Sequence, residues 1–198
     1  MRFPWRRSVL TMVGMPLGLL AAGALVWPQA HASFTSSTAT ATSWTAGTVQ
    51  FGPNQPVSKI VDVSGLLPGS TDDACVKLTY TGTLAAPVKL YLRDADLGGT
   101  GLATYLTVQI NEGTGNSSDC ADFVLGTTVY NAAGMPDTAR TLAAFNTATE
   151  NYGSGVGAWT ASPASTTRTY QVSWQVQASG AAAGKTASAT FTWEARNA

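Results

Sequence analysis

Histidine is nearly absent from this 198-residue chain: His31 is the only one. A zinc peptidase needs closely spaced histidine ligands, and a serine triad needs a histidine as its base. Neither site can be assembled from residues 32–198, and no other nucleophile motif takes its place. The sequence therefore predicts a protein that is not an enzyme and that holds no cofactor.

Charged residues are also scarce, at 11% of the chain. Lys and Arg number 11, as do Asp and Glu. Three of the basic residues fall within the first 32 positions, so the rest of the chain carries 8 basic residues against 11 acidic ones, a net charge of −3. A weakly acidic surface of this kind argues against nucleic acid and anionic lipid as partners.

Only two cysteines are present, Cys75 and Cys120. A metal or redox pair would require closely spaced ligands, which these two do not provide. In an exported chain two such cysteines are expected to form one disulfide.

The N-terminus has the three parts of a secretory signal. A basic region comes first, with Arg2, Arg6 and Arg7. The uncharged apolar stretch Val9–Val26 follows, and then Ala30-His31-Ala32, so we expect cleavage between Ala32 and Ser33 by a signal peptidase. Retention as a membrane anchor is the alternative, although Gly and Pro interrupt the apolar stretch. The arginine pair also leaves a twin-arginine export route open.

Alternation of apolar and polar residues dominates the remainder of the chain. It runs through residues 76–80, 88–92, 106–110, 170–177 and 187–193, with shorter candidates at 48–51, 59–63 and 123–130. A period of two predicts strands with one face on a core and the other in water. Gly- and Pro-rich turns separate these runs, which favours an all-β antiparallel sandwich, either jelly-roll-like or immunoglobulin-like.

One short helix is predicted at Pro136–Phe145, with Leu142 and Phe145 facing the core. Residues 152–167 are rich in Gly, Ser, Thr and Pro, so we expect a long surface loop there, carrying Trp159. No linker divides the chain further. The expected organisation is a signal at 1–32, a β-prone segment at 33–47 and one sandwich domain at 48–198.

Two features are candidates for ligand binding. Trp44 and Trp159 lie outside the alternating runs, and an exposed tryptophan can stack on a sugar ring, anchor an interface or plug the end of a sandwich. Asp94 and Asp96 precede two glycines and could contribute to a calcium loop, but the full ligand spacing is missing, which favours a solvated turn.

The segment behind the signal is suited to strand pairing. Residues 34–44 contain no proline, glycine or charge, and small residues alternate between the bulky Phe34 and Trp44. Such a strand could enter a groove of a neighbouring molecule, with the two aromatic residues setting its register. It could equally fold back on its own domain, because flat strands of small residues specify register weakly.

These features together resemble a known family. Ser33-Phe34-Thr35-Ser36, directly after the signal, and Trp44-Thr45-Ala46-Gly47-Thr48-Val49 are similar to the start of SipW-dependent secreted proteins of the camelysin and TasA group of Gram-positive bacteria. Residues 63–69, 76–82 and 191–195 also resemble that family and its actinobacterial members. The resemblance implies a jelly-roll sandwich in the biofilm matrix or on the cell surface, with members that polymerise by strand donation. Camelysin is named a metallopeptidase, an activity that residues 33–198 have no histidine to support.

Two functions therefore remain as expectations. The first is a secreted structural protein of the cell surface or matrix, able to self-assemble through residues 33–47. The second is a secreted carbohydrate-binding or adhesion module that recognises matrix or cell-wall polysaccharide.

Overall fold

Side chains that alternate between the interior and the surface define most elements of the computed structural model. It describes residues 35–37, 59–63, 65–163 and 165–197, and for 35–37 and 59–63 the backbone alone. Residues Phe34–Ala198 form one compact unit. Within the described part the chain is an all-β antiparallel sandwich with one α-helix, as the alternation predicts.

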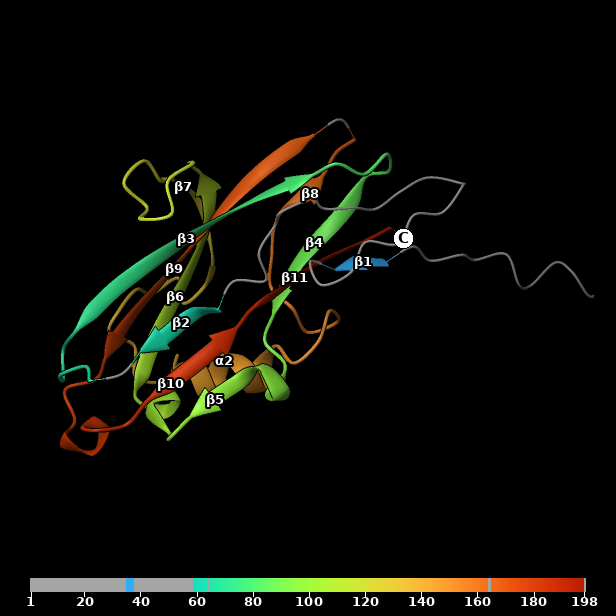
Figure 1. Ribbon diagram of the computed structural model, residues 1–198. Helices are drawn as coiled ribbons and strands as arrows, with labels where there is room; N and C mark the ends of the chain where they lie inside the picture. The colour runs from blue at the N-terminus through green and yellow to red at the C-terminus, as the bar shows by residue number, and fades with distance from the viewer. Residues whose placement is uncertain (1–34, 38–58, 64, 164, 198) are drawn as a thin grey trace, which may run out of the picture. The chain divides into compact units, whose positions relative to one another are not determined.

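Two layers make up the sandwich (Figure 1). One layer has four strands in the order β3-β9-β6-β7, namely Thr71–Tyr80, Thr166–Val176, Leu106–Thr114 and Val124–Tyr130. In the other layer, β10 (Ala187–Thr190) and β11 (Thr192–Arg196) follow each other around Phe191 and form its central strand. β1 (Thr35–Ser37) and β2 (Lys59–Val63) flank this strand on one side, and β4 (Ala86–Tyr91) and β5 (Leu97–Gly99) on the other; β8 (Thr160–Ala161) pairs with β4.

The connections between strands identify the topology. From β2 onward each connection crosses to the other layer, if β4–β5 and β10–β11 are each counted as one interrupted strand. The β6–β7 hairpin is the exception. This winding gives two four-stranded sheets whose strand order is that of a jelly roll, and it separates the fold from the immunoglobulin-like alternative.

A single apolar core lies between the layers. Alternate residues of β3 and β9 point inward, including Leu78, Tyr80, Tyr170 and Val172, all fully buried. Across from them, Trp193 lies 5.6 Å from Tyr170 between ring centroids. The inward alternation continues across the break at Phe191, so β10 and β11 serve the core as one strand.

The helix begins later than the sequence predicts. α2 covers Leu142–Ala148, whereas the expected span was Pro136–Phe145. Thr141 is its N-cap, and the Thr141 hydroxyl accepts a hydrogen bond from the backbone N–H of Ala144. Thr141 also forms a bridge with Thr107 of β6, so Thr141 itself is extended, and the residues before it form a turn in which the Arg140 N–H donates to the Asp137 carbonyl at 3.0 Å. Leu142 and Phe145 do face the core, as expected.

The remaining short helical turns are η1 (Asp94–Asp96), η2 (Leu102–Thr104) and η3 (Gly180–Ala182). The loop expected at 152–167 is only partly a loop. Val156 forms a bridge with Leu90, and β8 and the start of β9 fall within it. The connection therefore lies along β4 and completes the edge of the sheet, because the backbone groups of β4 need partners on that side.

Candidate functional site

The N-terminal segment pairs with the sandwich along β11, on the side of this strand opposite β4. β1 pairs antiparallel with β11, with Thr35 opposite Arg196, Ser36 opposite Ala195 and Ser37 opposite Glu194. β2 lies along β10 on the same side of the central strand. The first strand of the jelly roll is thus divided into β1 and β2, and β1 contacts the β11 half through three residues.

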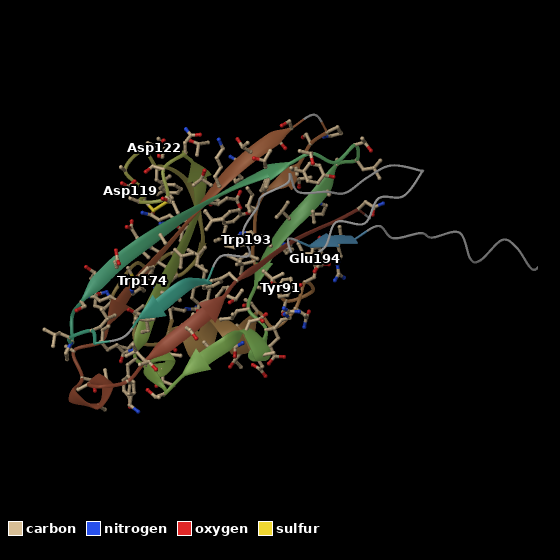
Figure 2. All side chains as sticks on the ribbon, viewed as in Figure 1. Tyr91, Asp119, Asp122, Trp174, Trp193 and Glu194 are labelled. Carbon is tan, nitrogen blue, oxygen red and sulfur yellow. A yellow bond between two sulfur atoms is a disulfide. The ribbon has the colours of Figure 1, made fainter. Side chains whose placement is uncertain are left out.

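A buried carboxylate lies at this position. Trp193 and Ala195 of β11 point into the core, so Glu194 and Arg196 project from the opposite face. The Tyr91 hydroxyl donates a hydrogen bond to Glu194 Oε2 at 2.9 Å, and Arg196 Nε donates to Glu194 Oε1 at 2.8 Å. Figure 2 labels Tyr91 and Glu194 beside β4 and β11. Charge-assisted hydrogen bonds of this kind compensate the cost of burying a carboxylate.

Tyr152 links a third segment to the same cluster. The Arg196 guanidinium lies 4.3 Å from the centre of the Tyr152 ring, and the Tyr152 hydroxyl donates to the carbonyl of Pro87 at 3.0 Å. β4, β11 and the connection before β8 are therefore tied together by side chains as well as by the sheet. We call Tyr91, Tyr152, Glu194 and Arg196 the β11 cluster.

The electrostatics of the β11 cluster favour the protonated forms of Tyr91 and Arg196. Burial, followed by the hydrogen bond to Glu194 and the Glu194 charge, raises the pKa of Tyr91 to about 12. The hydrogen bond to Glu194 likewise raises the pKa of Arg196. Both partners of the carboxylate therefore stay protonated around neutral pH and can keep donating to Glu194.

The predicted disulfide is confirmed. Cys75 of β3 is joined to Cys120 of the β6–β7 hairpin, with 5.2 Å between their Cα atoms. The Cys75 N–H donates to the Ser118 carbonyl at 3.1 Å, and Lys77 Nζ donates to Asn116 Oδ1 at 2.6 Å. These contacts fix the hairpin loop to the edge strand β3 (Figure 2). A disulfide of this type indicates folding in an oxidising environment.

Asp122 organises the inside of that loop. Both carboxylate oxygens accept hydrogen bonds from the backbone N–H of Asn116, at 3.0 and 2.9 Å, and one accepts from that of Ser117 at 2.9 Å. These hydrogen bonds, from Ser117 first and then Asn116, lower the pKa of Asp122. The Asp122 carboxylate therefore has a structural role, because it binds backbone N–H groups of its own loop.

The calcium candidates Asp94 and Asp96 lie in η1. Asp96 accepts a hydrogen bond from Arg93 Nε at 2.6 Å, which pairs it with a cation of the chain itself. Across the described residues, no group of three or more His, Cys, Asp or Glu side chains is placed to hold a metal ion.

Trp159 does not have the exposed ring that a ligand contact requires. It is 5% exposed and belongs to the core. The adjacent Ala158 N–H donates to Glu112 Oε2 at 3.1 Å, and the Tyr170 hydroxyl donates to the same oxygen at 3.2 Å. Arg168 Nε lies 3.6 Å from Glu112 Oε1, so a partly exposed arginine forms an ion pair with a buried carboxylate next to Trp159.

Several predicted site residues lie outside the described residues. These are the cleavage-site residues Ala30, Ala32 and Ser33, and Phe34, Trp44, Ala46 and Gly47 of the assembly segment. In the described ranges, none of the helices is both long enough and apolar enough to span a membrane.

The β11 cluster itself was not predicted from the sequence. Glu194 and Arg196 are two positions apart next to the core residue Trp193, a pattern that places both charges on one face of a strand. That pattern could have been noticed. Tyr91 and Tyr152 are distant in sequence, and only the jelly-roll connections bring them to β11.

Comparisons with known proteins give no further assignment: no protein-family model matches the chain, and neither does a curated protein or a solved structure.

Proposed function

We propose that this chain is a secreted, non-catalytic structural protein of the cell surface or biofilm matrix, and that its N-terminal segment joins copies by strand donation. The observation that carries the proposal is the pairing of β1 with β11. A three-residue strand, separated from β2 by residues 38–58, occupies one side of β11, a central strand of its layer.

The same pairing can be made within one chain or between two. An unpaired side of β11 presents a row of N–H and C=O groups, and a strand from a second copy satisfies them as well as the chain's own β1. Exchange of an identical element between copies needs no new contacts and propagates into a fibre when the geometry does not close. The resemblance to the camelysin and TasA group supports the same assembly mode, as does an export signal followed directly by this segment.

A double-cysteine variant distinguishes the two pairings. Residues that face each other in an antiparallel pair have Cα atoms about 4.5–5.5 Å apart, within the range that a disulfide spans. Thr35→Cys/Arg196→Cys should therefore form disulfide-linked ladders on non-reducing gels if β1 is donated to a neighbour. A cross-linked monomer with no higher species would overturn strand donation. Each single-cysteine variant is the control for non-specific cross-linking.

Deletion of the donor segment provides the second test. The chain from Ser33 should form filaments or long oligomers, seen by negative-stain microscopy and size-exclusion chromatography, while a chain from Thr48 should form neither. Equal behaviour of the two proteins would contradict the assembly role of the segment.

A specific observation favours the second function, binding of a neutral polysaccharide. A row of hydrogen-bonded polar side chains crosses the four-stranded sheet: Gln171 donates to Asp73 at 2.6 Å, and Asn111 donates to Gln171 at 3.1 Å. Thr128 completes the row by donating to Asn111 at 2.8 Å. Planar amides and hydroxyls are the groups that sugar hydroxyls pair with. Retarded migration in polysaccharide gels, lost in Gln171→Ala, would support this function, whereas unchanged migration of the parent would remove it.

A further inference from the structure

Strand β7 is an edge strand of the four-stranded layer (Figure 1), and a hollow lies where this strand ends. The hollow has a volume of about 370 Å³. Its lining consists of the last three residues of β7 and part of the segment that follows: Thr128, Val129, Tyr130, Asn131, Ala132, Ala133, Asp137 and Arg140. Binding sites for small molecules typically measure about 300–1,000 Å³, so this hollow has room for one small ligand.

Contacts with one core residue fix the wall of the hollow. Val108 of β6 is fully buried. Its carbonyl accepts a hydrogen bond from Asn131 Nδ2 at 3.0 Å, and its N–H donates to the Arg140 carbonyl at 3.0 Å. The Asp137 carboxylate accepts a hydrogen bond from the Ala139 N–H at 3.0 Å. The polar residues of the wall are therefore in position before a ligand arrives, which lowers the cost of binding one.

Three side chains of the lining retain hydrogen-bonding capacity for a ligand. Asn131 is 7% exposed, and its Oδ1 accepts no hydrogen bond within the described residues. An acceptor left unpaired in the interior costs free energy, and a hydroxyl that reached it from the hollow would restore the missing hydrogen bond. Arg140 Nε and Asp137 Oδ2 are 4.0 Å apart, farther than the ~2.7–2.9 Å of a direct charge-assisted hydrogen bond. A hydroxyl between them can accept from the guanidinium and donate to the carboxylate.

The charges of the lining favour a neutral ligand with several hydroxyl groups. An anion would meet the Asp137 carboxylate and the Asn131 oxygen, and a cation would meet the Arg140 guanidinium. An apolar ligand would leave these groups without partners, at a cost in desolvation. Hydroxyls both donate and accept, so they satisfy both kinds of group. Ala132 and Ala133 supply an apolar part of the wall, which suits the C–H surface of a sugar ring.

The hollow lies at one end of the row of polar side chains that crosses the same sheet. Thr128, the last member of that row, is also part of the lining. Gln109 lies two positions before Asn111 on β6, hence on the same face of the strand, and its Nε2 donates to the Asn131 carbonyl at 3.1 Å. The row and the hollow are therefore adjacent parts of one polar surface.

We propose that this hollow binds one neutral sugar unit, either a free sugar or one unit of a polysaccharide. Arg140 and Asp137 bind one hydroxyl between them, and Asn131 Oδ1 accepts a hydrogen bond from another. In a polysaccharide, the neighbouring units lie along the polar row, and in that respect the inference rests on the polysaccharide-binding function proposed above.

Titration of the isotope-labelled chain from Ser33 with sugars, followed by NMR, tests the proposal. The probes are glucose, galactose, mannose and N-acetylglucosamine, all neutral, with glucuronate and glucosamine as charged counterparts. At least one neutral sugar should shift the backbone amide signals of residues 128–140, and the charged sugars should do so only at several-fold higher concentrations. Absence of these shifts with every neutral sugar, or equal binding of the charged sugars, overturns the proposal.

Two substitutions test whether the lining residues hold the sugar. Arg140→Met removes a donor and should raise the sugar concentration at half-saturation several-fold. Ala133→Trp fills the hollow from an exposed position and should abolish the shifts. Arg93→Met is the matched control, because it removes an exposed arginine that pairs with Asp96 in η1, and it should leave binding unchanged. Unchanged binding in either lining variant overturns the proposal, and the dispersion of the NMR signals shows whether each variant is folded.

Polysaccharide gels separate this inference from the function on which it rests. If both hold, the parent is retarded, and Arg140→Met and Gln171→Ala each migrate faster. Retardation that Gln171→Ala reduces and Arg140→Met leaves unchanged would show that the row binds polysaccharide without the hollow, which overturns the polysaccharide as the source of the sugar unit. A parent that is not retarded, but whose amide signals shift with a free sugar, would remove the second function and support a site for free sugars.

Discussion

The Tyr91 hydroxyl donates a hydrogen bond to the buried Glu194 carboxylate across the β4–β11 pair, at 2.9 Å. The two residues are 103 positions apart in the chain. The contact secures the central strand of one sheet to its neighbour at the position where β1 pairs on the other side.

Replacement of Tyr91 by Phe should destabilise the protein by about 1–3 kcal/mol, because it leaves a buried carboxylate oxygen without its donor. The free energy of unfolding in urea measures the loss. Tyr105→Phe is the control, since that ring lies beside Lys185 and away from Glu194. An effect no larger than that of the control would show that water replaces the Tyr91 hydroxyl.

Alkaline pH should destabilise the fold through the same residue. The pKa of Tyr91 is raised to about 12, from an ordinary value of about 10. Its neutral form is therefore favoured by the folded state, and the stability that it contributes is complete below pH ~10 and falls as pH rises towards ~12. Unfolding free energies at several pH values across this range should fall less steeply in Tyr91→Phe than in the parent. Parallel slopes would contradict the shift.

The ion pair between Arg168 and Glu112 gives a third prediction. Arg168→Met should lower the free energy of unfolding by about 1–3 kcal/mol, because Glu112 remains buried without its cation. The loss should be smaller than for a fully buried pair, since the Arg168 side chain is 35% exposed. Arg93→Met is the matched control: it breaks an exposed pair with Asp96 and should cost less than ~1 kcal/mol. Adding Glu112→Gln to Arg168→Met should restore part of the loss, and urea denaturation measures all four proteins.

Loss of the disulfide should be the largest of these effects. The bond closes a loop across a separation of 45 residues, for which chain entropy gives an upper figure of about 4 kcal/mol. Cys75→Ser/Cys120→Ser should show this loss in thermal and urea unfolding, and the parent in reductant should match it. A reduced parent as stable as the oxidised one would mean that the hairpin loop holds its place through hydrogen bonds alone.

The fold was predictable because its strands have one face on the apolar core and one face towards solvent. The alternation at 76–80, 106–110 and 170–177 leads directly to β3, β6 and β9, with the expected residues inside. The helix start was wrong because Thr141 is both a cap and a bridge partner of Thr107, and the second role depends on a strand far away in sequence.

The site was less predictable because its contacts are long-range. Trp159 lies in a segment rich in turn-forming residues, and its burial follows from the bridge between Val156 and Leu90, which no local pattern indicates. The partners of Glu194 come from β4 and from the connection before β8 for the same reason. Periodicity predicts which way a side chain points, but the topology decides what it meets.

The jelly-roll connections also bear on how fast this protein reaches its native state. The strand β10–β11 pairs with β2 and β4, whose residues are about a hundred or more positions away, and among the described strands only the β6–β7 hairpin is local. A fold dominated by such distant pairings forms slowly, because large loops must close before contacts compensate their entropy. During that interval the edges of both sheets lack their partners. Crowding of newly made chains in that interval therefore favours pairing between molecules, so the yield of monomer should depend on the rate of synthesis.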